Sequence, residues 1–239
     1  MLSDVDIKKK INDKSIFIYP FSERNLEGAG VYVTASKFAW SLRTKEKICD
    51  EYGNIRIPMN DTAMIVSEEV ISLDWRTAGI CLSRVGMVFR GLRHAETPLK
   101  PGFSGRLVLA IYNHTDEEVK INIGDKIAVV VFYELRRGLT NRLEGTGHPT
   151  FALAKVVKMD LEDRNMILDN HKEFRGYKEH LKNKDKWQWK RYVSSALMLI
   201  VAVIFFLIGV FFLPEHKELF CDLGLACFAV SVGTFVKNN

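Results

Sequence analysis

Residues 106–113 read RLVLAIYN and residues 126–134 read KIAVVVFYE. Both runs are rich in β-branched and aromatic residues, which favour strands. Between them lie Asn113-His114-Thr115-Asp116 and Gly124-Asp125, residue types that are typical of turns. Spacings this short leave no room for crossover helices, so neighbouring strands should run antiparallel. We therefore predict a mainly β domain, built as a barrel or a sandwich.

Two short helices are predicted within this β domain. Ser3 followed three residues later by Asp6 is an N-cap pattern, with Ile7 and Ile11 on one face of the helix that follows. Residues 75–85 predict a second short helix, closed by Gly86 as a left-handed C-terminal residue.

The averages of the whole chain describe an ordinary globular protein. It has 239 residues, 47% of them hydrophobic and 26% charged, with a formal net charge of +5 and a mean hydropathy of −0.02. This apolar content excludes a disordered chain, and 16 Gly, 6 Pro and 4 Cys exclude a collagen-like or disulfide-dense scaffold. A charge of +5 gives no argument for nucleic acid, so we expect no nucleic-acid partner.

The C-terminal part is far more apolar than this average. Residues 192–213 read YVSSALMLIVAVIFFLIGVFFL without a charged residue, and about 20 apolar residues in a helix span a bilayer. The alternative is a buried helix of a soluble core, but such helices rarely run so long without a polar face. After a break at Pro214, residues 219–236 form a shorter apolar run with Asp222 near its start. We predict a two-helix transmembrane hairpin over residues 192–236.

Five basic residues and one acidic residue stand directly before the first apolar run, in residues 182–191. The positive-inside rule places such a side in the cytoplasm. The first residues contain no apolar h-region, so we expect no cleavable signal peptide. We predict a multi-pass protein of the cell inner membrane, with its N-terminal domain and C-terminal tail in the cytoplasm. The residues predicted to lie at the lipid headgroups are Lys186, Trp187, Trp189, Lys190 and Arg191.

The chain is thus predicted to have three parts: a β domain (1–158), a helical basic connector (159–191) and the hairpin (192–236). The connector is polar with scattered apolar residues and no sustained heptad, so it is either a solvated spacer or a stalk that self-associates. Cys49 and Cys81 stand alone in the β domain, without a Cys-x-x-Cys pattern or a Cys/His cluster. We therefore expect neither a disulfide nor a bound metal.

One dense polar cluster stands out in residues 84–106. No nucleophile, phosphate-loop or metalloprotease motif accompanies it, so the residues alone assign no catalytic group and no cofactor. Several guanidinium groups close together suit a polyphosphate or another anion, because each can donate paired hydrogen bonds. The alternative is a solvated surface loop. The predicted ligand contacts are Arg84, Arg90, Arg93, Lys100, Ser104 and Arg106.

Four segments, in this order, resemble the dCTP deaminases. Residues 1–7 read MLSDVDI, residues 82–87 read LSRVGM, residues 101–113 read PGFSGRLVLAIYN, and residues 123–132 read IGDKIAVVVF. Their order and spacing match across residues 1–135, apart from a few extra residues near 93–97. The resemblance implies the dUTPase-like fold, a distorted β-barrel or jelly roll that usually forms trimers with nucleotide sites between subunits.

The sequence departs from this family at positions that carry its chemistry. The family pattern Gly-Arg-Ser-Ser-Leu-Ala-Arg is here AGICLSR at residues 78–84, so only the last Arg remains, as Arg84. Lys100 replaces an Asp that contacts the sugar, and Ala110 replaces the catalytic Glu. A methyl group cannot transfer a proton, and losing a general acid or base costs about 10²–10⁴-fold in rate. Glu96 is the nearest candidate for a relocated catalyst. The resemblance thus implies a catalytically degenerate member.

The predicted architecture resembles bacterial anti-phage effectors, in which a ligand-recognition domain carries two transmembrane helices. We expect a membrane-anchored nucleotide-binding sensor and effector, in which a nucleotide or cyclic dinucleotide controls the hairpin. The lipid bilayer and further copies of the chain, a trimer by resemblance, are the other expected partners. The alternative is an active membrane-tethered dCTP deaminase or dUTPase of pyrimidine nucleotide metabolism. A third is a structural anchor that recruits a partner protein.

Overall fold

The computed structural model describes residues 1–137, 139, 152–168, 179, 193, 197, 200, 201, 203 and 204. The chain divides into two compact units, Met1–Tyr177 and Lys178–Asn239, and the fold given below is that of the first. The predicted headgroup residues and almost all of the predicted hairpin lie outside the described residues. In the part of the chain that is described, no helix has the length and apolar character needed to cross a membrane.

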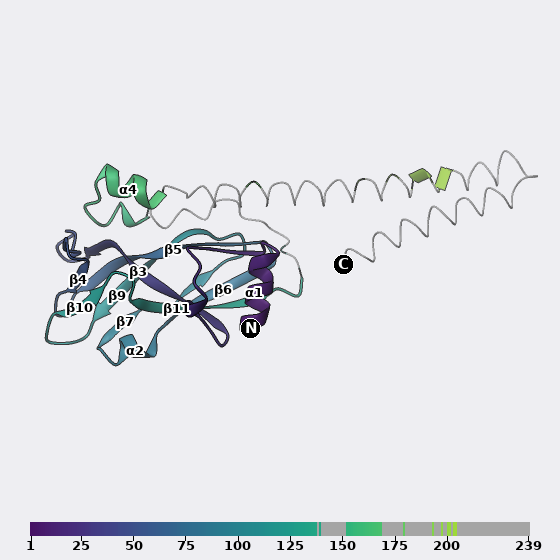
Figure 1. The fold of residues 1–239 in the computed structure, drawn as a ribbon. Coiled ribbons are helices and arrows are strands. Elements are labelled where there is room, and N and C mark those ends of the chain that lie inside the picture. Colours follow the sequence, from purple (N-terminus) through teal and green to yellow (C-terminus); the bar gives the residue numbers. More distant parts are fainter. Residues whose placement is uncertain are drawn as a thin grey trace, which may run out of the picture. The chain divides into compact units, whose positions relative to one another are not determined.

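Antiparallel strands are the main secondary structure of the first unit (Figure 1). Within the described residues, one sheet has nine strands in the order β7-β9-β5-β3-β11-β6-β8, with β1 added to β5 and β2 added to β3. Its strands are β1 (Ile16–Tyr19), β2 (Leu26–Glu27), β3 (Gly30–Ser41), β5 (Thr62–Leu73), β6 (Thr77–Ser83), β7 (Leu92–His94), β8 (Thr97–Leu99), β9 (Ser104–Asn113) and β11 (Lys126–Glu134). A second sheet pairs β4 (Asn54–Ile57) with β10 (Val119–Asn122). The prediction of a mainly β domain is confirmed.

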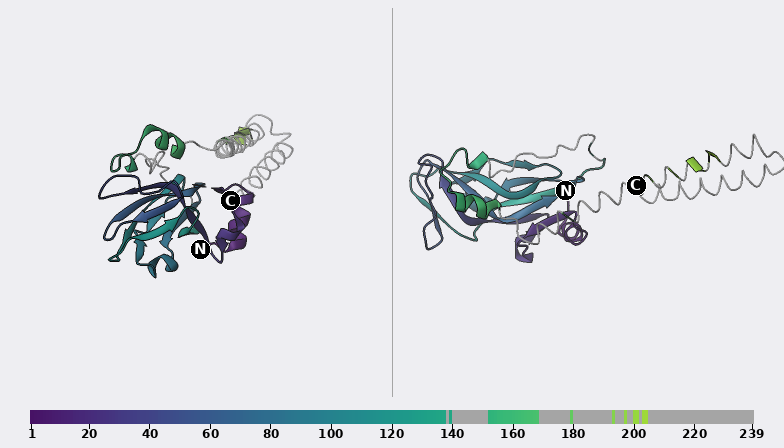
Figure 2. Two further views of the ribbon diagram at one scale, coloured as in Figure 1. Left: turned by 60° about the vertical axis from the view of Figure 1, so that its left-hand side comes forward. Right: turned by 90° about the horizontal axis from the view of Figure 1, so that it is seen from above.

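The two ends of the large sheet meet at one corner. Strand β7 lies at one end of the strand order and β8 at the other, yet only Ala95 and Glu96 separate them in the chain. The Ser83 hydroxyl, at the end of β6, donates to the carbonyl of His94 in β7 at 3.1 Å and ties the corner together. The sheet must therefore curl into a half-barrel, which two further views show (Figure 2).

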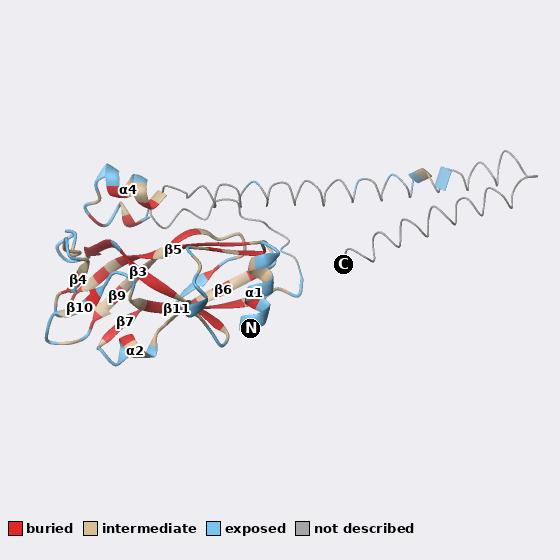
Figure 3. Ribbon diagram, in the orientation of Figure 1, coloured by how far each residue is buried: buried red, intermediate tan, exposed pale blue. Residues whose placement is uncertain are grey.

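The two faces of the sheet bury different sets of side chains. In β9, Leu107, Leu109 and Ile111 are buried in the main core, while Val108 and Ala110 on the opposite face are half-buried. This alternation follows from the two-residue period of a strand. Figure 3 shows buried residues along the middle of the strands and exposed ones at the loops. The sheet therefore has an outer face of its own, against which other segments can pack.

Two irregularities in neighbouring strands coincide around a buried carboxylate. The β3–β5 register shifts between Ala35 and Ala39, and the β5–β9 register shifts between Val66 and Val70. Glu69, 3% exposed, accepts hydrogen bonds from the backbone N–H and the hydroxyl of Thr34, both at 2.8 Å. The carboxylate thus supplies an acceptor that the interrupted ladder lacks.

The structure confirms one predicted helix and corrects the other. Helix α1 (Asp4–Asn12) begins at Ser3, which forms a reciprocal capping box with Asp6. The predicted helix at residues 75–85 is wrong, because residues 77–83 form strand β6, which pairs with β11 on one side and β8 on the other. The helix at this place is the short α2 (Val85–Val88), and Gly86 lies inside it rather than closing it. Hydrogen bonding to a strand on each side thus makes these residues a strand, whatever their local preference for a helix.

Residues 152–168, which we call the strap, pack on the outer face of the sheet. The strap contains α4 (Leu161–Leu168). Its apolar side chains form a second buried cluster, separate from the main core, made of Leu153, Val157 and Ile167 with Phe38, Trp40 and Val66. The rings of Phe38 and Trp40 stack within it, with centroids 6.5 Å apart and planes 11° apart. The first ten residues of the predicted connector therefore lie against the β domain.

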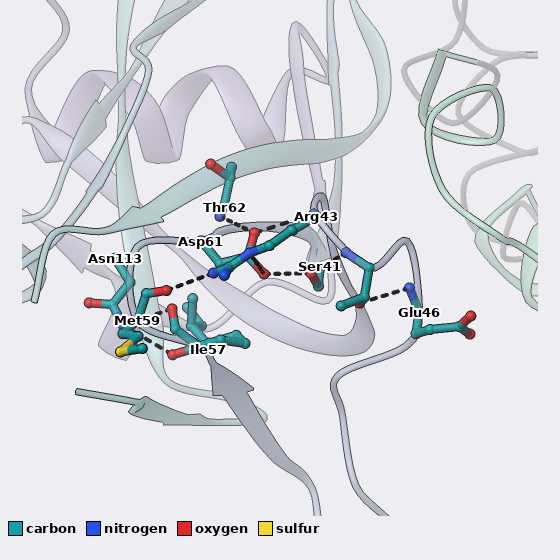
Figure 4. A network of polar contacts seen from close by, with 10 residues as sticks. Ser41, Arg43, Glu46, Ile57, Met59, Asp61, Thr62 and Asn113 are labelled. Carbon is teal, nitrogen blue, oxygen red and sulfur yellow. Dashed lines mark hydrogen bonds and ion pairs between the residues drawn. The ribbon is translucent and has the colours of Figure 1, made fainter. Parts of the chain in front are cut away.

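A buried amide closes the turn that follows β9. Asn113 is fully buried, and its Nδ2 donates to the carbonyls of Ile57, Pro58 and Glu117 at 3.1, 3.1 and 2.8 Å. Figure 4 shows it beside a second polar group, in which Asp61 accepts from the hydroxyl of Ser41 and Arg43 Nη2 donates to the carbonyl of Met59. Three main-chain carbonyls thus depend on one side chain.

Replacing Asn113 tests this dependence. We expect Asn113→Ala to lower the free energy of unfolding by at least about 2 kcal/mol, because buried carbonyls lose their donor. Asn113→Asp keeps an acceptor for the hydroxyl of Thr115 but cannot donate, so it should destabilise at least as much at neutral pH. Denaturant unfolding measures both. The exposed Asn122→Ala is the control, expected within about 0.5 kcal/mol of wild type; a stable Asn113→Asp protein would contradict the prediction.

Glu69 predicts a pH dependence of stability. Burial raises the pKa of this carboxyl above its ordinary 4.5, against the hydrogen bonds from Thr34 that lower it. The folded chain then holds the proton to higher pH than the unfolded chain, so the free energy of unfolding should fall as pH rises above 4.5 through the folded pKa. Glu69→Gln should remove this decline. Urea unfolding of both proteins over this pH range measures it, and a constant difference between them would contradict the assignment.

Candidate functional site

The corner where the sheet edges meet gathers several polar groups. Arg84 follows β6 and is the N-cap residue of α2, with an extended backbone. His94 is 4% exposed, and its Nδ1 lies 2.8 Å from the carbonyl of Ala95. Within the described residues, the buried Nε2 of His94 has no hydrogen-bond partner. Glu96 is exposed in the two-residue connection. The corner thus combines a cation, a carboxylate and an imidazole.

Arg84 also joins a group of side chains that we call the Tyr32 cluster, made of Tyr32, Arg84 and Lys126. The guanidinium carbon of Arg84 lies 5.7 Å from the ring centroid of Tyr32, and Lys126 Nζ lies 4.5 Å from it. Arg84 Nη1 donates to the carbonyl of Lys126 at 3.2 Å. Lys126 Nζ donates to the carbonyl of Arg24 at 2.9 Å. The end of β6 and the starts of β11 and β3 therefore bring two cations to one aromatic ring.

The charge of this cluster is not balanced locally. All three side chains are half-buried, and in the described ranges neither Arg84 nor Lys126 has an ion pair with a carboxylate. A guanidinium can donate paired hydrogen bonds to a phosphate, and a neighbouring ammonium adds a second positive charge. An aromatic ring beside them offers a flat apolar surface. The arrangement suits an anion that carries a ring.

Two of the other predicted contacts lie on neighbouring elements. Arg93 is exposed in β7 and pairs with Tyr112 of β9, one residue before His94. The structure therefore brings Arg93 near the corner that holds Arg84. Arg90 is exposed after α2, and its Nη2 donates to the carbonyl of Lys120 in β10. Arg90 is thus directed to the second sheet.

The remaining three predicted contacts lie at the other end of β9. Lys100 is exposed in the turn before it. The buried hydroxyl of Ser104 has no hydrogen-bond partner in the described part of the chain. Arg106 is 5% exposed, and its Nη1 donates to the carbonyls of Ser67, at 3.0 Å, and Glu68. This guanidinium supports the irregular part of β5. The six predicted residues therefore do not form one group.

Ala110 lies in an apolar part of the outer face. It pairs with Met64 of β5, and Val108 shares its side of β9 two residues away. Both Met64 and Val108 pack against the second buried cluster, which the strap covers. The position that the resemblance gives to a catalytic Glu is thus bordered by packed hydrophobic side chains.

The cysteine of β6 offers no reactive thiolate. Cys81 is buried, and burial, with a smaller contribution from Glu96, raises its pKa to about 12. It remains a neutral thiol at physiological pH and behaves as a small apolar side chain.

Sequence reasoning finds Arg84 but misses Tyr32 and Lys126. Lys126 stands inside one of the segments that resemble the dCTP deaminases, but nothing local marks it as part of a site. Tyr32 alternates with the buried Val31 and Val33 in β3, which indicates that it faces outward without indicating what it meets. Only the register of β3, β11 and β6 brings the three together.

Comparison with known proteins relates most of this domain to one family. The model of the dCTP deaminase-like family matches residues 1–135. The dCTP deaminase of Pyrococcus furiosus is 29% identical over 150 residues, 61% of this chain and 94% of that protein. The enzyme of Thermococcus kodakarensis is 30% identical over 159 residues, covering 65% and 97%. The crystal structure of the Agrobacterium tumefaciens enzyme superposes with a TM-score of 0.47 at 10% identity, covering 55% of this chain and 47% of that one.

The family match spans more than half of the chain and includes the strands that carry the Tyr32 cluster and the corner. The chain therefore belongs to the dCTP deaminase-like family through its residues 1–135.

Proposed function

We propose that this protein is a nucleotide-binding sensor that has lost deaminase catalysis and controls a C-terminal membrane segment. The Tyr32 cluster supports nucleotide binding, because two unbalanced cations and an aromatic ring match a phosphorylated compound with a base. Arg84 is its central contact, and Arg93 of the neighbouring corner is a further candidate contact. The similarity to dCTP deaminases supports a nucleotide rather than another anion.

The observation that carries the loss of catalysis is the surroundings of Ala110. A general acid or base must be titratable and within hydrogen-bond reach of the reacting group. Ala110 is neither, and its neighbours Met64 and Val108 are apolar and packed against a buried cluster. A carboxylate restored at this position would stand beside hydrophobic packing, which disfavours its charged form.

One observation favours the enzymatic alternative. Glu96 is exposed at the corner that also holds Ser83, His94 and Arg84. An active membrane-tethered deaminase or dUTPase would have to use this carboxylate in place of the missing one. The two functions therefore differ in whether nucleotide is turned over, and in whether Glu96 is needed for it.

The proposed signal passes through changes in assembly. A nucleotide bound between copies of the chain, a trimer by family likeness, would favour one packing of the β domains. The hairpin at 192–236 would respond to that packing, and the response cannot exceed the difference in the ligand's affinity for the two states. We place the β domain in the cytoplasm and the hairpin in the cell inner membrane of a bacterium, as in the anti-phage effectors that the architecture resembles.

Calorimetry with purified full-length protein tests nucleotide binding. We expect a dCTP, dUTP or cyclic dinucleotide titration to give binding that Arg84→Ala and Lys126→Ala each weaken at least about tenfold, the value of one charge-assisted hydrogen bond. Arg76→Ala is the matched control, since Arg76 is exposed at the opposite end of β6. In the same samples, dCTP and dUTP should remain unconverted.

Two results would contradict this proposal. Equal affinities for wild type and Arg84→Ala would remove the Tyr32 cluster as the site. Multiple turnovers of dCTP or dUTP that Glu96→Gln abolishes would establish the enzymatic alternative.

Membrane attachment has its own test. We expect full-length protein to stay in the membrane fraction through carbonate extraction, because two apolar spans hold it there. A chain ending after Tyr177, the limit of the first compact unit, should be recovered in the supernatant. Extraction of the full-length protein by carbonate would refute the hairpin.

A further inference from the structure

A pocket of about 650 Å³ opens beside the loop between β3 and β4, and its lining includes none of the residues of the Tyr32 cluster. Its walls come from this loop, from the β3 irregularity and from the turn after β10. The lining residues that matter here are Lys37, Lys47, Cys49, Tyr52, Asn122 and Ile123. Its size falls in the range of small-molecule sites.

Two lysines of the pocket wall have their ammonium groups near the ring of Phe38, which belongs to the second buried cluster. Lys37 Nζ lies 5.4 Å and Lys47 Nζ 5.9 Å from the ring centroid of Phe38. Both charges also act on the thiol of Cys49. Burial and the charge of Asp50 raise the pKa of this thiol, and the two lysines lower it. Lys37 and Lys47 both line the pocket. An anion bound in the pocket is therefore attracted by two positive charges.

The carboxylates at the pocket do not cancel both charges. Asp50 accepts from Asn54 and lies 3.6 Å from Arg56 Nε, so its charge is already engaged. Glu51 is exposed and lines the pocket, so its negative charge repels an anion bound there. Within the described ranges, Lys37 has no carboxylate partner and Lys47 has one, Asp163 of the strap.

Lys47 balances the charge of Asp163, a buried carboxylate of the strap. Its Nζ lies 3.0 and 2.9 Å from the two carboxylate oxygens of Asp163. Asp163 is 4% exposed, whereas the side chain of Lys47 is 41% exposed and reaches the pocket. Removing the partner of a buried charge is strongly destabilising. An eight-residue helix such as α4 also cannot persist without its packing. The docked strap therefore depends on Lys47.

We propose that Lys37 and Lys47 form a second anion site, which takes a phosphorylated small molecule, and that binding there releases the strap. The phosphate draws Lys47 away from Asp163, and the buried carboxylate left behind then favours undocking. Tyr52, 82% exposed, and Ile123, 43% exposed, supply apolar surface for the rest of the ligand, and Asn122 supplies polar contacts. This inference concerns residues outside the proposed nucleotide site and does not depend on that site.

Hydrogen exchange of the full-length protein, with inorganic pyrophosphate as the probe at constant ionic strength, tests the proposal. We expect pyrophosphate to accelerate amide exchange of residues 152–168. The concentration needed should rise about tenfold in Lys37→Ala, which loses one charge-assisted contact. It should fall roughly threefold in Glu51→Gln, which loses an exposed opposing charge. Both substitutions are at exposed positions, so the fold should survive them.

Asp163→Asn separates binding from release. It leaves no charge behind when Lys47 moves, so pyrophosphate should bind at least as tightly while exchange of the strap stays unchanged. Arg84→Ala should respond as wild type does, which keeps the outcome distinct from that of the Tyr32 cluster. The proposal is overturned if pyrophosphate slows or does not affect strap exchange in wild type, if Lys37→Ala responds at the same concentration, or if chloride at equal ionic strength has the same effect.

Discussion

The fold depends on the connection between β7 and β8, which is only two residues long. These strands are at opposite ends of the sheet order, so the chain can join them only if the sheet curls until its ends meet. Curling encloses the main core on one side and leaves an outer face on the other. The corner positions Ser83, Arg84 and His94 together, and the coinciding irregularities of β3 and β5 allow the bend at the cost of an interrupted ladder. Glu69 restores an acceptor there.

The outer face relates this geometry to function. Over parts of β3, β5 and β9 it is covered by the chain's own strap, and Ala110 lies beside that packed region. Two pairs of cations gather around aromatic rings, Arg84 and Lys126 at Tyr32, and Lys37 and Lys47 at Phe38. Under the proposed function, charged ligands bind at the borders of this packed surface, and no acid–base chemistry takes place within it.

The elements that can be predicted from the sequence are those that depend on residues close together in the chain. The strands at 106–113 and 126–134 follow from β-branched runs and turn residues, and the capping box of α1 follows from Ser3 and Asp6. Residues 77–83 contain small side chains without clear alternation, so only pairing with β8 and β11 makes them a strand. The candidate site also depends on strand pairing. Arg84 belongs to a segment that is recognisable in the sequence, but Tyr32 and Lys126 are brought beside Arg84 only by the register of β3, β11 and β6. The connector looks polar and solvated in sequence because its few buried residues are spaced irregularly along the strap.

The edges of the two sheets have a consequence for assembly. Among the described residues, six strands pair with one other strand each and are short: two residues in β2, three in β7 and β8, and four in β1, β4 and β10. Strand β8 also carries Pro98, which has no N–H to offer an added strand. Short edges and proline are how β proteins resist uncontrolled strand addition and fibre growth. Strand addition at these six short strands is therefore disfavoured, which protects them from edge-to-edge joining of copies.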